Sequence, residues 1–218
     1  MKRKSVSILI LCILLAVCMN AGADNTAQDK KNLENAAKTV LAPLAESFED
    51  TEAIPIISIL RRAGAEVTVA SLGELTVTSA QGLKVIADRK INDCANDKFD
   101  LIVLHGGMPA AKYLHDSDIL KRLLIEQNRQ GKLYAAICAS PVVVLNAHGL
   151  LDGKRATSYP SMAEKLSDNS AAGERVVTDK NCITSQGPGT SMEFALTLVE
   201  ALYGKEKAAK LKKGYLVK

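Results

Sequence analysis

The sequence lacks a strong excess of charge of either sign, and it has no internal repeat and no low-complexity tract. Its 28 Lys and Arg residues against 24 Asp and Glu residues give a net charge of +4 at pH 7 over 218 residues. Long-range attraction to nucleic acid or to an anionic membrane surface needs a strongly positive potential. The charge therefore gives no support to either kind of partner.

Clustered metal ligands are also missing. The three histidines, His105, His115 and His148, do not stand at zinc-site spacing from any of the cysteines. We therefore expect no metal site, and we expect no other cofactor.

No apolar run at the N-terminus reaches the length of a membrane span. The apolar stretch at residues 8–17 is short beside the ~20 residues that a spanning helix needs. It follows Lys2, Arg3 and Lys4 and precedes the small residues 21–23, which is the pattern of a secretory signal peptide.

The sequence therefore predicts a signal peptide over residues 1–23, a flexible polar leader over residues 24–37 and a single domain over residues 38–218. The protein would then enter the secretory pathway and be secreted or periplasmic, with no stable membrane contact after cleavage near Ala23. In the alternative, an uncleaved signal peptide would anchor the chain in a membrane.

Loss of the signal peptide would leave three cysteines, Cys94, Cys138 and Cys182. An odd number guarantees at least one thiol outside any intramolecular disulfide. Cys182 lies in a strand-like apolar run and is expected in the core. Cys94 stands among Asn and Asp residues and is expected to be exposed.

Short apolar runs alternate with helical patterns along the domain. The runs that predict strands are residues 39–42, 66–72, 101–104 and 133–137. Strands separated by helices of this length imply βαβ units with right-handed crossovers. We therefore expect an α/β fold, a flavodoxin-like three-layer sandwich with a mostly parallel central sheet.

Three further segments complete the predicted fold. Residues 76–88 contain turn residues and predict a small antiparallel excursion, and residues 173–184 predict two more short strands. Residues 192–203 form a strongly amphipathic helical pattern that Gly204 ends.

The segment around Cys138 is typical of a nucleophile elbow. An apolar strand-like run stops at Cys138, Ser140 can cap a following helix, and Pro141 suits the first helical turn. A thiol facing a helix N-terminus is expected to have a lowered pKa and to be reactive. An inert, buried cysteine is the other interpretation, and the segment alone leaves both open.

Two other loops follow predicted strands at the edge where sites form in such sheets. Gly106 and Gly107 can aim backbone N–H groups at a developing oxyanion, although adjacent glycines also mark ordinary turns. The loop after the first strand carries four acids: Glu46, Glu49, Asp50 and Glu52. One of them could turn inward, but acids also favour the first turn of a helix.

Five segments, in order, closely resemble the ThiJ/PfpI superfamily, in particular its parkinsonism-associated protein deglycase branch. They are EDTEAIPIISILRRAG, GGMPAAKYL, AAICASPVVVL, RATSYPS and SQGPGTSMEFALTLVEALYGKEKA. The resemblance implies a class I glutamine amidotransferase-like fold and a homodimer. It also implies a glyoxalase III-like lyase or deglycase that acts on methylglyoxal or on early glycation adducts.

The resemblance also implies roles for individual residues. Cys138 matches the nucleophilic, oxidation-sensitive cysteine of the family, and Glu52 matches an acid whose protonated carboxyl hydrogen-bonds that cysteine. Gly106 and Gly107 match the backbone oxyanion site, with the N–H of Ala139 as a second donor.

The sequence departs from the family pattern around the site and at the dimer contact. Tyr159 stands where some relatives have a histidine near the nucleophile, and His105 replaces a proline before the glycines; both are expected next to the site. Gln81 replaces a common arginine at the dimer contact, and Ser58 replaces an aspartate that faces Arg62. These changes bear on dimerisation more than on the chemistry.

Two other functions compete with the glyoxalase. A cysteine protease of the superfamily would carry a histidine directly after its nucleophile, where this chain has Ala139. A redox sensor or holdase chaperone would use the oxidation of Cys138 instead of turnover.

Overall fold

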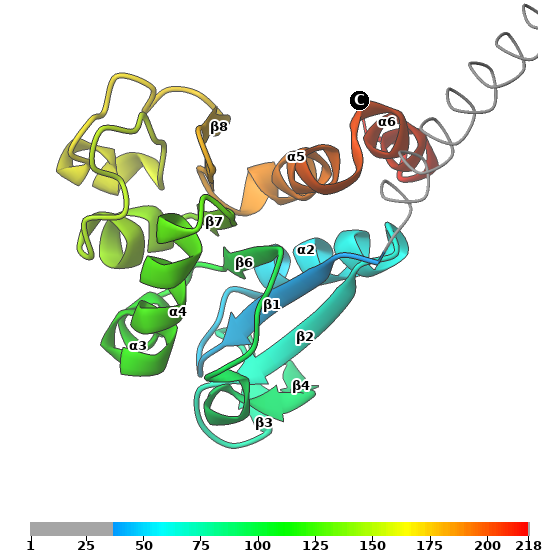
Figure 1. The fold of residues 1–218 in the computed structure, drawn as a ribbon, viewed down its shortest axis with the longest axis vertical. Coiled ribbons are helices and arrows are strands. Elements are labelled where there is room, and N and C mark those ends of the chain that lie inside the picture. Colours follow the sequence, from blue (N-terminus) through cyan, green and yellow to red (C-terminus); the bar gives the residue numbers. More distant parts are fainter. Residues whose placement is uncertain (1–36, 218) are drawn as a thin grey trace, which may run out of the picture. The chain divides into compact units, whose positions relative to one another are not determined.

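The computed structural model describes residues 37–217, which are built around a seven-stranded sheet (Figure 1). The strand order is β5-β2-β1-β6-β7-β9-β8, and all neighbours are parallel except β8 and β9. The strands are β1 (Thr39–Leu44), β2 (Glu66–Ser71), β5 (Arg89–Lys90), β6 (Leu101–Leu104), β7 (Leu133–Ile137), β8 (Val176–Asp179) and β9 (Cys182–Ser185). The predicted flavodoxin-like, mostly parallel fold is confirmed.

Helices cover both faces of this sheet. On one face α2, α5 and α6 pack against one another, and α3 and α4 lie on the other face (Figure 1). The helices are α2 (Asp50–Arg62), α3 (Ala110–Asp116), α4 (Asp118–Arg129), α5 (Ser191–Tyr203) and α6 (Lys205–Gly214). Because both faces are covered, all four residues of β6 are buried, which explains its uninterrupted apolar sequence.

The smaller predicted elements are also present. β3 (Thr76–Thr78) and β4 (Lys84–Ile86) form the antiparallel excursion, and β8 and β9 are the two late strands. Gly204 ends α5 with φ 86°, a backbone conformation that suits glycine, and its N–H donates to Glu200 O.

The prediction that Cys94 is exposed was wrong. The short 3₁₀ helix η1 (Ile91–Cys94) turns Asn92 and Asp93 outward and Cys94 inward, where its side chain is fully buried. Periodicity over four residues is too short to show which side of such a turn faces the core. Cys182 is buried as expected, and Cys94, Cys138 and Cys182 are all free thiols.

The strand order has a topological switch point between β1 and β6. The chain runs from β1 outward to β2 and returns to add β6 on the other side of β1. The loops after β1 and β6 therefore leave the sheet in opposite directions, which is where α/β sheets bind ligands. The acids of the first loop and the two glycines of the second meet at this place.

Within residues 37–217, no helix combines the length and the apolar character that a membrane crossing requires. The predicted signal peptide, residues 1–23, and all but the last residue of the predicted leader lie outside the described residues.

Truncation of a buried side chain on the central strand β6 tests the assignment of the core. Ile102, in the middle of the sheet on β6, is 1% exposed. We expect Ile102→Ala to lower the free energy of unfolding by about 2–5 kcal/mol, because it removes buried methyl groups and leaves a cavity. Urea denaturation measures the change. Ile125→Ala, on the outer side of α4 and 44% exposed, is the control and should cost about 0.5 kcal/mol or less; equal losses would contradict the assignment of the core.

Candidate active site

Cys138 occupies a strained turn between β7 and the helix η2 (Pro141–Asn146). Its φ is 65°, a left-handed conformation that non-glycine residues seldom adopt. Two backbone hydrogen bonds hold the turn: Cys138 N–H donates to Ser185 O at 3.0 Å, and Tyr159 N–H donates to Cys138 O at 2.8 Å. The local geometry is that of the nucleophile elbow predicted from the sequence.

The start of the helix after the elbow differs in one respect from the prediction. Pro141 lies in the first turn as expected, but the Ser140 side chain does not cap the helix and instead donates its hydroxyl to His105 O. The helix is wound as a π-helix, a form that is often found at functional sites. Ser140 thus joins the elbow to the loop that follows β6.

Glu52 is the one acid of the first loop that turns inward. Its side chain is fully buried, and Oε2 accepts a hydrogen bond of 2.7 Å from Gly106 N–H. The other three acids bind groups at the rim of the loop. Glu49 caps α2 through Thr51, Asp50 accepts from the Ser79 hydroxyl, and Glu46 accepts from Thr78 N–H.

Gly106 allows the thiol and the carboxyl to meet. A Cβ at this position would lie 2.4 Å from Cys138 Cβ, 2.9 Å from Cys138 Sγ and 2.8 Å from Glu52 Oε2. No side chain fits there, so the thiol and the carboxyl close over the bare backbone of residue 106. The glycine can be read from the sequence, but the sequence does not show that the Cys138 thiol and the Glu52 carboxyl both pack against it.

Gly107 is required for a different reason. Its φ is 89°, and a Cβ would lie 2.9 Å from both Ser47 O and Glu49 N. The loop after β6 is thereby packed directly on the loop that leads into α2. Both glycines fix the loop, although only one of them contacts the reactive groups.

The backbone donors at the site have separate partners. The N–H groups of Gly107 and Ala139 lie close enough to the Cys138 sulfur to lower the pKa of its thiol. Gly106 N–H is already bound to Glu52. Of the three predicted oxyanion donors, Gly107 and Ala139 therefore lie beside the nucleophile, and Gly106 binds the acid.

Burial sets the protonation of Glu52. Removal of the carboxyl from water raises its pKa from 4.5 to about 7, against the smaller opposing effects of Cys138 and of Gly106 N–H. The negative charge of nearby Glu49 raises it further. Near neutral pH the carboxyl therefore exists in both forms, as a group that transfers protons requires.

The pKa of the Cys138 thiol moves in the direction opposite to the prediction. Burial raises it first, and the neighbouring Glu52 carboxylate raises it further, while the Gly107 and Ala139 N–H groups lower it. The thiol is only 9% exposed. The favourable helix terminus is outweighed because a second negative charge would have to be buried beside Glu52.

His105 and Tyr159 both adjoin the site, in different ways. His105 is 3% exposed, its Nδ1 lies 2.6 Å from Gly106 O, and burial lowers its pKa to about 4. It is therefore neutral and supports the glycine loop. Tyr159 is 45% exposed and packs its ring on Gly187, where a Cβ would lie 3.3 Å from the ring and 3.9 Å from Glu52 Oε1.

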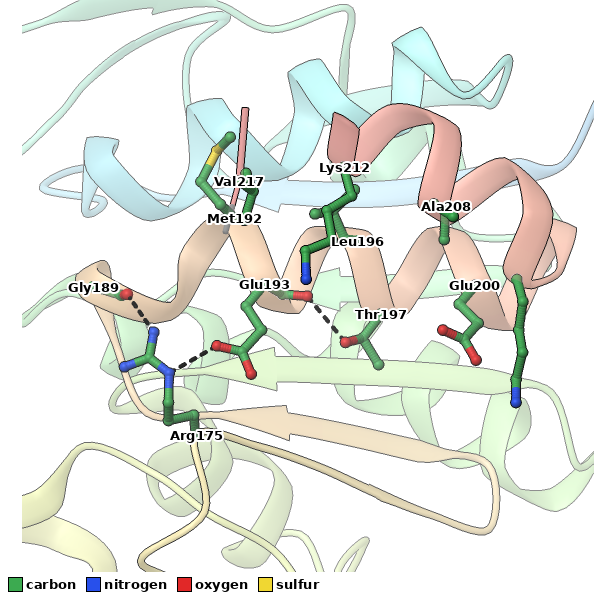
Figure 2. Close-up of a pocket in the computed structure, with 12 residues that line it drawn as sticks. Arg175, Gly189, Met192, Glu193, Leu196, Thr197, Glu200, Ala208, Lys212 and Val217 are labelled. Carbon is green, nitrogen blue, oxygen red and sulfur yellow. Dashed lines mark hydrogen bonds and ion pairs between the residues drawn. The ribbon is translucent and has the colours of Figure 1, made fainter. Parts of the chain in front are cut away.

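Sequence analysis missed the residues that hold Gly187 in place. Arg175, at the start of β8, donates to Gly189 O at 2.8 Å and to Glu193 at 2.7 Å (Figure 2). Ser185 binds Thr190, which accepts from Gly187 N–H at 3.1 Å. No local signal marks these residues, because the pairing of β8 with β9 brings them together.

A groove of about 660 Å³ lies between α5 and α6, and Figure 2 draws the residues that line it. Its apolar lining includes Leu196 and Ala208, and neither Cys138 nor Glu52 reaches it. Among residues 37–217, no group of three or more His, Cys, Asp or Glu side chains is arranged to hold a metal ion.

Comparison with known proteins gives a consistent family. The DJ-1/PfpI family model matches residues 38–201. Protein DJ-1 homolog B of Arabidopsis thaliana is 46% identical over 179 residues, which are 82% of this chain and 41% of that protein. The chain thus spans less than half the length of this plant relative.

Two other relatives match over nearly their whole length. Glutathione-independent glyoxalase DJR-1.2 of Caenorhabditis elegans is 35% identical, over 83% of this chain and 95% of that protein. The solved structure of oxidized Toxoplasma gondii DJ-1 has a TM-score of 0.81 and 44% identity, over 83% of this chain and 98% of that one.

These relatives correct the predicted localisation. They are DJ-1 proteins, which are typically cytosolic, and no comparison shows a signal peptide. The prediction of a secreted or periplasmic protein, with its membrane-anchored alternative, was wrong. The prediction rested on basic residues before a short apolar run, which is a pattern of composition alone. The family model matches residues 38–201, and Protein dj-1beta of Drosophila melanogaster is 44% identical over 83% of this chain and 98% of that protein. The chain therefore belongs to the DJ-1/PfpI family.

Proposed function

We propose that residues 38–218 act as a single domain with glutathione-independent glyoxalase or related deglycase activity. The observation that carries the proposal is the meeting of the Cys138 thiol and the buried Glu52 carboxyl over Gly106. The C. elegans relative named as a glutathione-independent glyoxalase supports the same reaction class.

The reaction begins at the aldehyde carbon of methylglyoxal. Glu52 takes the thiol proton as Cys138 Sγ forms a C–S bond, and the N–H groups of Gly107 and Ala139 stabilise the charge on the carbonyl oxygen. Protonation of that oxygen gives a hemithioacetal. Proton removal from the thiol during attack overcomes the raised pKa of Cys138, because no free thiolate has to accumulate.

Glu52 then moves one proton along the substrate. It removes the hydrogen from the former aldehyde carbon to give an enediol, and it returns a proton to the adjacent carbon. The product is a thioester of lactate. Water cleaves the C–S bond, releases lactate and restores the thiol, so the net reaction adds one water to methylglyoxal.

Glycated amines present the same aldehyde in masked form. An early adduct is a hemiaminal, which dissociates to amine and free aldehyde. Consumption of the aldehyde at Cys138 draws this equilibrium toward the free amine. The same site can therefore carry out both the glyoxalase and the deglycase activity.

A redox sensor or holdase chaperone is the second candidate function, because the similar Toxoplasma structure is described as oxidized. One peroxide would convert the Cys138 thiol to a sulfenic acid with loss of water, and a second would give the sulfinic acid. The Gly107 and Ala139 N–H groups that lie beside the sulfur could donate to the added oxygens. Intact-mass measurement after mild peroxide, compared with Cys138→Ser, tests this function.

We further propose that the protein forms a homodimer through α2 and the β3–β4 hairpin. A groove of about 550 Å³ lies between them, with Ile54 and Ile86 exposed at its edge. Ser58, where the sequence departs from the family, and the neighbouring Arg62 both contact Tyr215: the Ser58 hydroxyl at 3.4 Å and the Arg62 guanidinium 5.0 Å from the ring centre. Tyr215 thus partners Arg62 in place of an aspartate.

Lactate formation from methylglyoxal tests the proposed activity. We expect Cys138→Ala to abolish it and Glu52→Gln to lower kcat/KM by about 10²-fold or more, because both proton transfers lose their carrier. Glu46→Gln, an exposed acid of the same loop, is the matched control and should retain activity. Turnover by Glu52→Gln at the wild-type rate would refute the role of Glu52.

The pH dependence of kcat/KM tests the protonation of the pair. Nucleophilic attack requires that the Cys138 thiol and the Glu52 carboxyl together hold one proton. At low pH they hold two, and the Glu52 proton is lost first, with a raised pKa of about 7. The rate should therefore fall about tenfold per pH unit below 7 and level off above it. Glu49→Gln removes a charge that raises this pKa, so its midpoint should move to lower pH. A midpoint near 4.5 in the wild type would contradict the burial effect.

Mass measurement by light scattering tests the dimer. Ile86 is 76% exposed on the hairpin, and we expect Ile86→Lys to convert a dimer into a monomer by placing a charge in the interface. Ile125→Lys, on the opposite side of the sheet, should leave the dimer intact. A monomeric wild-type protein, or dissociation by Ile125→Lys alone, would rule out this interface.

A further inference from the structure

Tyr159 adjoins the site through both its backbone and its ring. Its backbone N–H donates to Cys138 O at 2.8 Å, which fixes residue 159 beside the elbow. Its ring covers the face of Gly187, where a Cβ would lie 3.3 Å from Cδ2 and 3.9 Å from Glu52 Oε1. The ring, the bare glycine and the acid therefore border one place.

The same residue is where the site meets solvent. Tyr159 is 45% exposed, whereas Glu52 is 0% and Cys138 9% exposed. Glu52 Oε1 is buried and has no hydrogen-bond partner among the described residues. Of these three residues, Tyr159 is the one that presents an exposed surface to a molecule approaching Glu52 and Cys138.

The other side of this approach is closed and fixed. Gly106 leaves no room between the thiol and the acid. Gly187 is held by the Thr190 hydroxyl, and the next residues of its loop are held by the bond from Arg175 to Gly189 O. A substituent on the substrate therefore finds no room between the thiol and the acid, and the exposed ring of Tyr159 is a surface available to it.

We propose that the Tyr159 ring is a specificity wall that favours 2-oxoaldehydes with a flat apolar substituent, such as an aryl group, over methylglyoxal. This inference rests on the proposed function and names its substrate class. An aromatic ring offers a planar apolar surface on which a second ring stacks in an offset geometry, whereas a methyl group covers little of it. Tyr159 thus acts as a positioning residue for the part of the substrate that does not react.

The preference for an aryl substituent is measured with two substrates tested side by side. We expect the ratio of kcat/KM for phenylglyoxal over methylglyoxal to fall about 3- to 10-fold in Tyr159→Ala, the range that loss of one aromatic pair produces. Tyr159→Phe keeps the ring and should keep the ratio, while Tyr159→Leu keeps bulk without the ring and should lose it. Tyr113→Ala is the matched control, since Tyr113 is also 45% exposed.

A second measurement is independent of turnover. Phenacyl bromide and bromoacetone alkylate a thiol by the same step, in which the C–S bond forms, bromide leaves and the thiol proton passes to a base. We expect the ratio of their rates at Cys138, followed by intact mass, to fall in Tyr159→Ala and to persist in Tyr159→Phe. Cys138→Ala provides the background.

The outcomes separate the two proposals. If the ratio of the two alkylation rates is unchanged in Tyr159→Ala, including the case in which both rates fall equally, the proposed role of Tyr159 in specificity is wrong. A merely structural role would slow both reagents alike. Absence of lactate from the wild type overturns the proposed function, and the alkylation ratio still decides the wall.

Discussion

The closure of Cys138 and Glu52 over the bare backbone of Gly106 is the contact on which the rest of the site depends. A Cβ at residue 106 would collide with both groups, so glycine is the residue that permits the contact. The elbow, with φ 65° at Cys138, and the first turn of α2 bring the groups in from opposite sides. The crossover between β1 and β6 brings these two elements to the same edge of the sheet.

Burial at this contact has an electrostatic consequence. Two acidic groups beside one another in a site with little water cannot both ionise easily, so the pair retains a proton near neutrality. The proton lies where it can pass between sulfur, carboxyl and a bound carbonyl compound. The same arrangement suits an oxidisable cysteine, because Gly107 and Ala139 N–H groups lie beside the sulfur in either function.

Much of the fold could be predicted from the sequence because its signals are local. Apolar runs marked β6 and β7, and Gly204 marked the end of α5. The failures occurred where a neighbour distant in sequence decides the outcome. The thiol pKa depends on Glu52, which lies on another element, and Ser140 binds His105 O instead of capping its own helix. Cys94 faces the core through a turn too short to show a period.

The sequence by itself determined the α/β architecture, the position of the elbow and the family, because these follow from short patterns that each carry their own physical reason. The tertiary structure decided which of four acids became buried, which glycine N–H remained for the sulfur, and that Arg175 holds the loop beside Tyr159. These depend on contacts between segments that only the strand order brings together. The effects of burial and charge on a residue depend on groups within a few ångströms of it in space. The number of residues between two groups in the sequence does not give that distance.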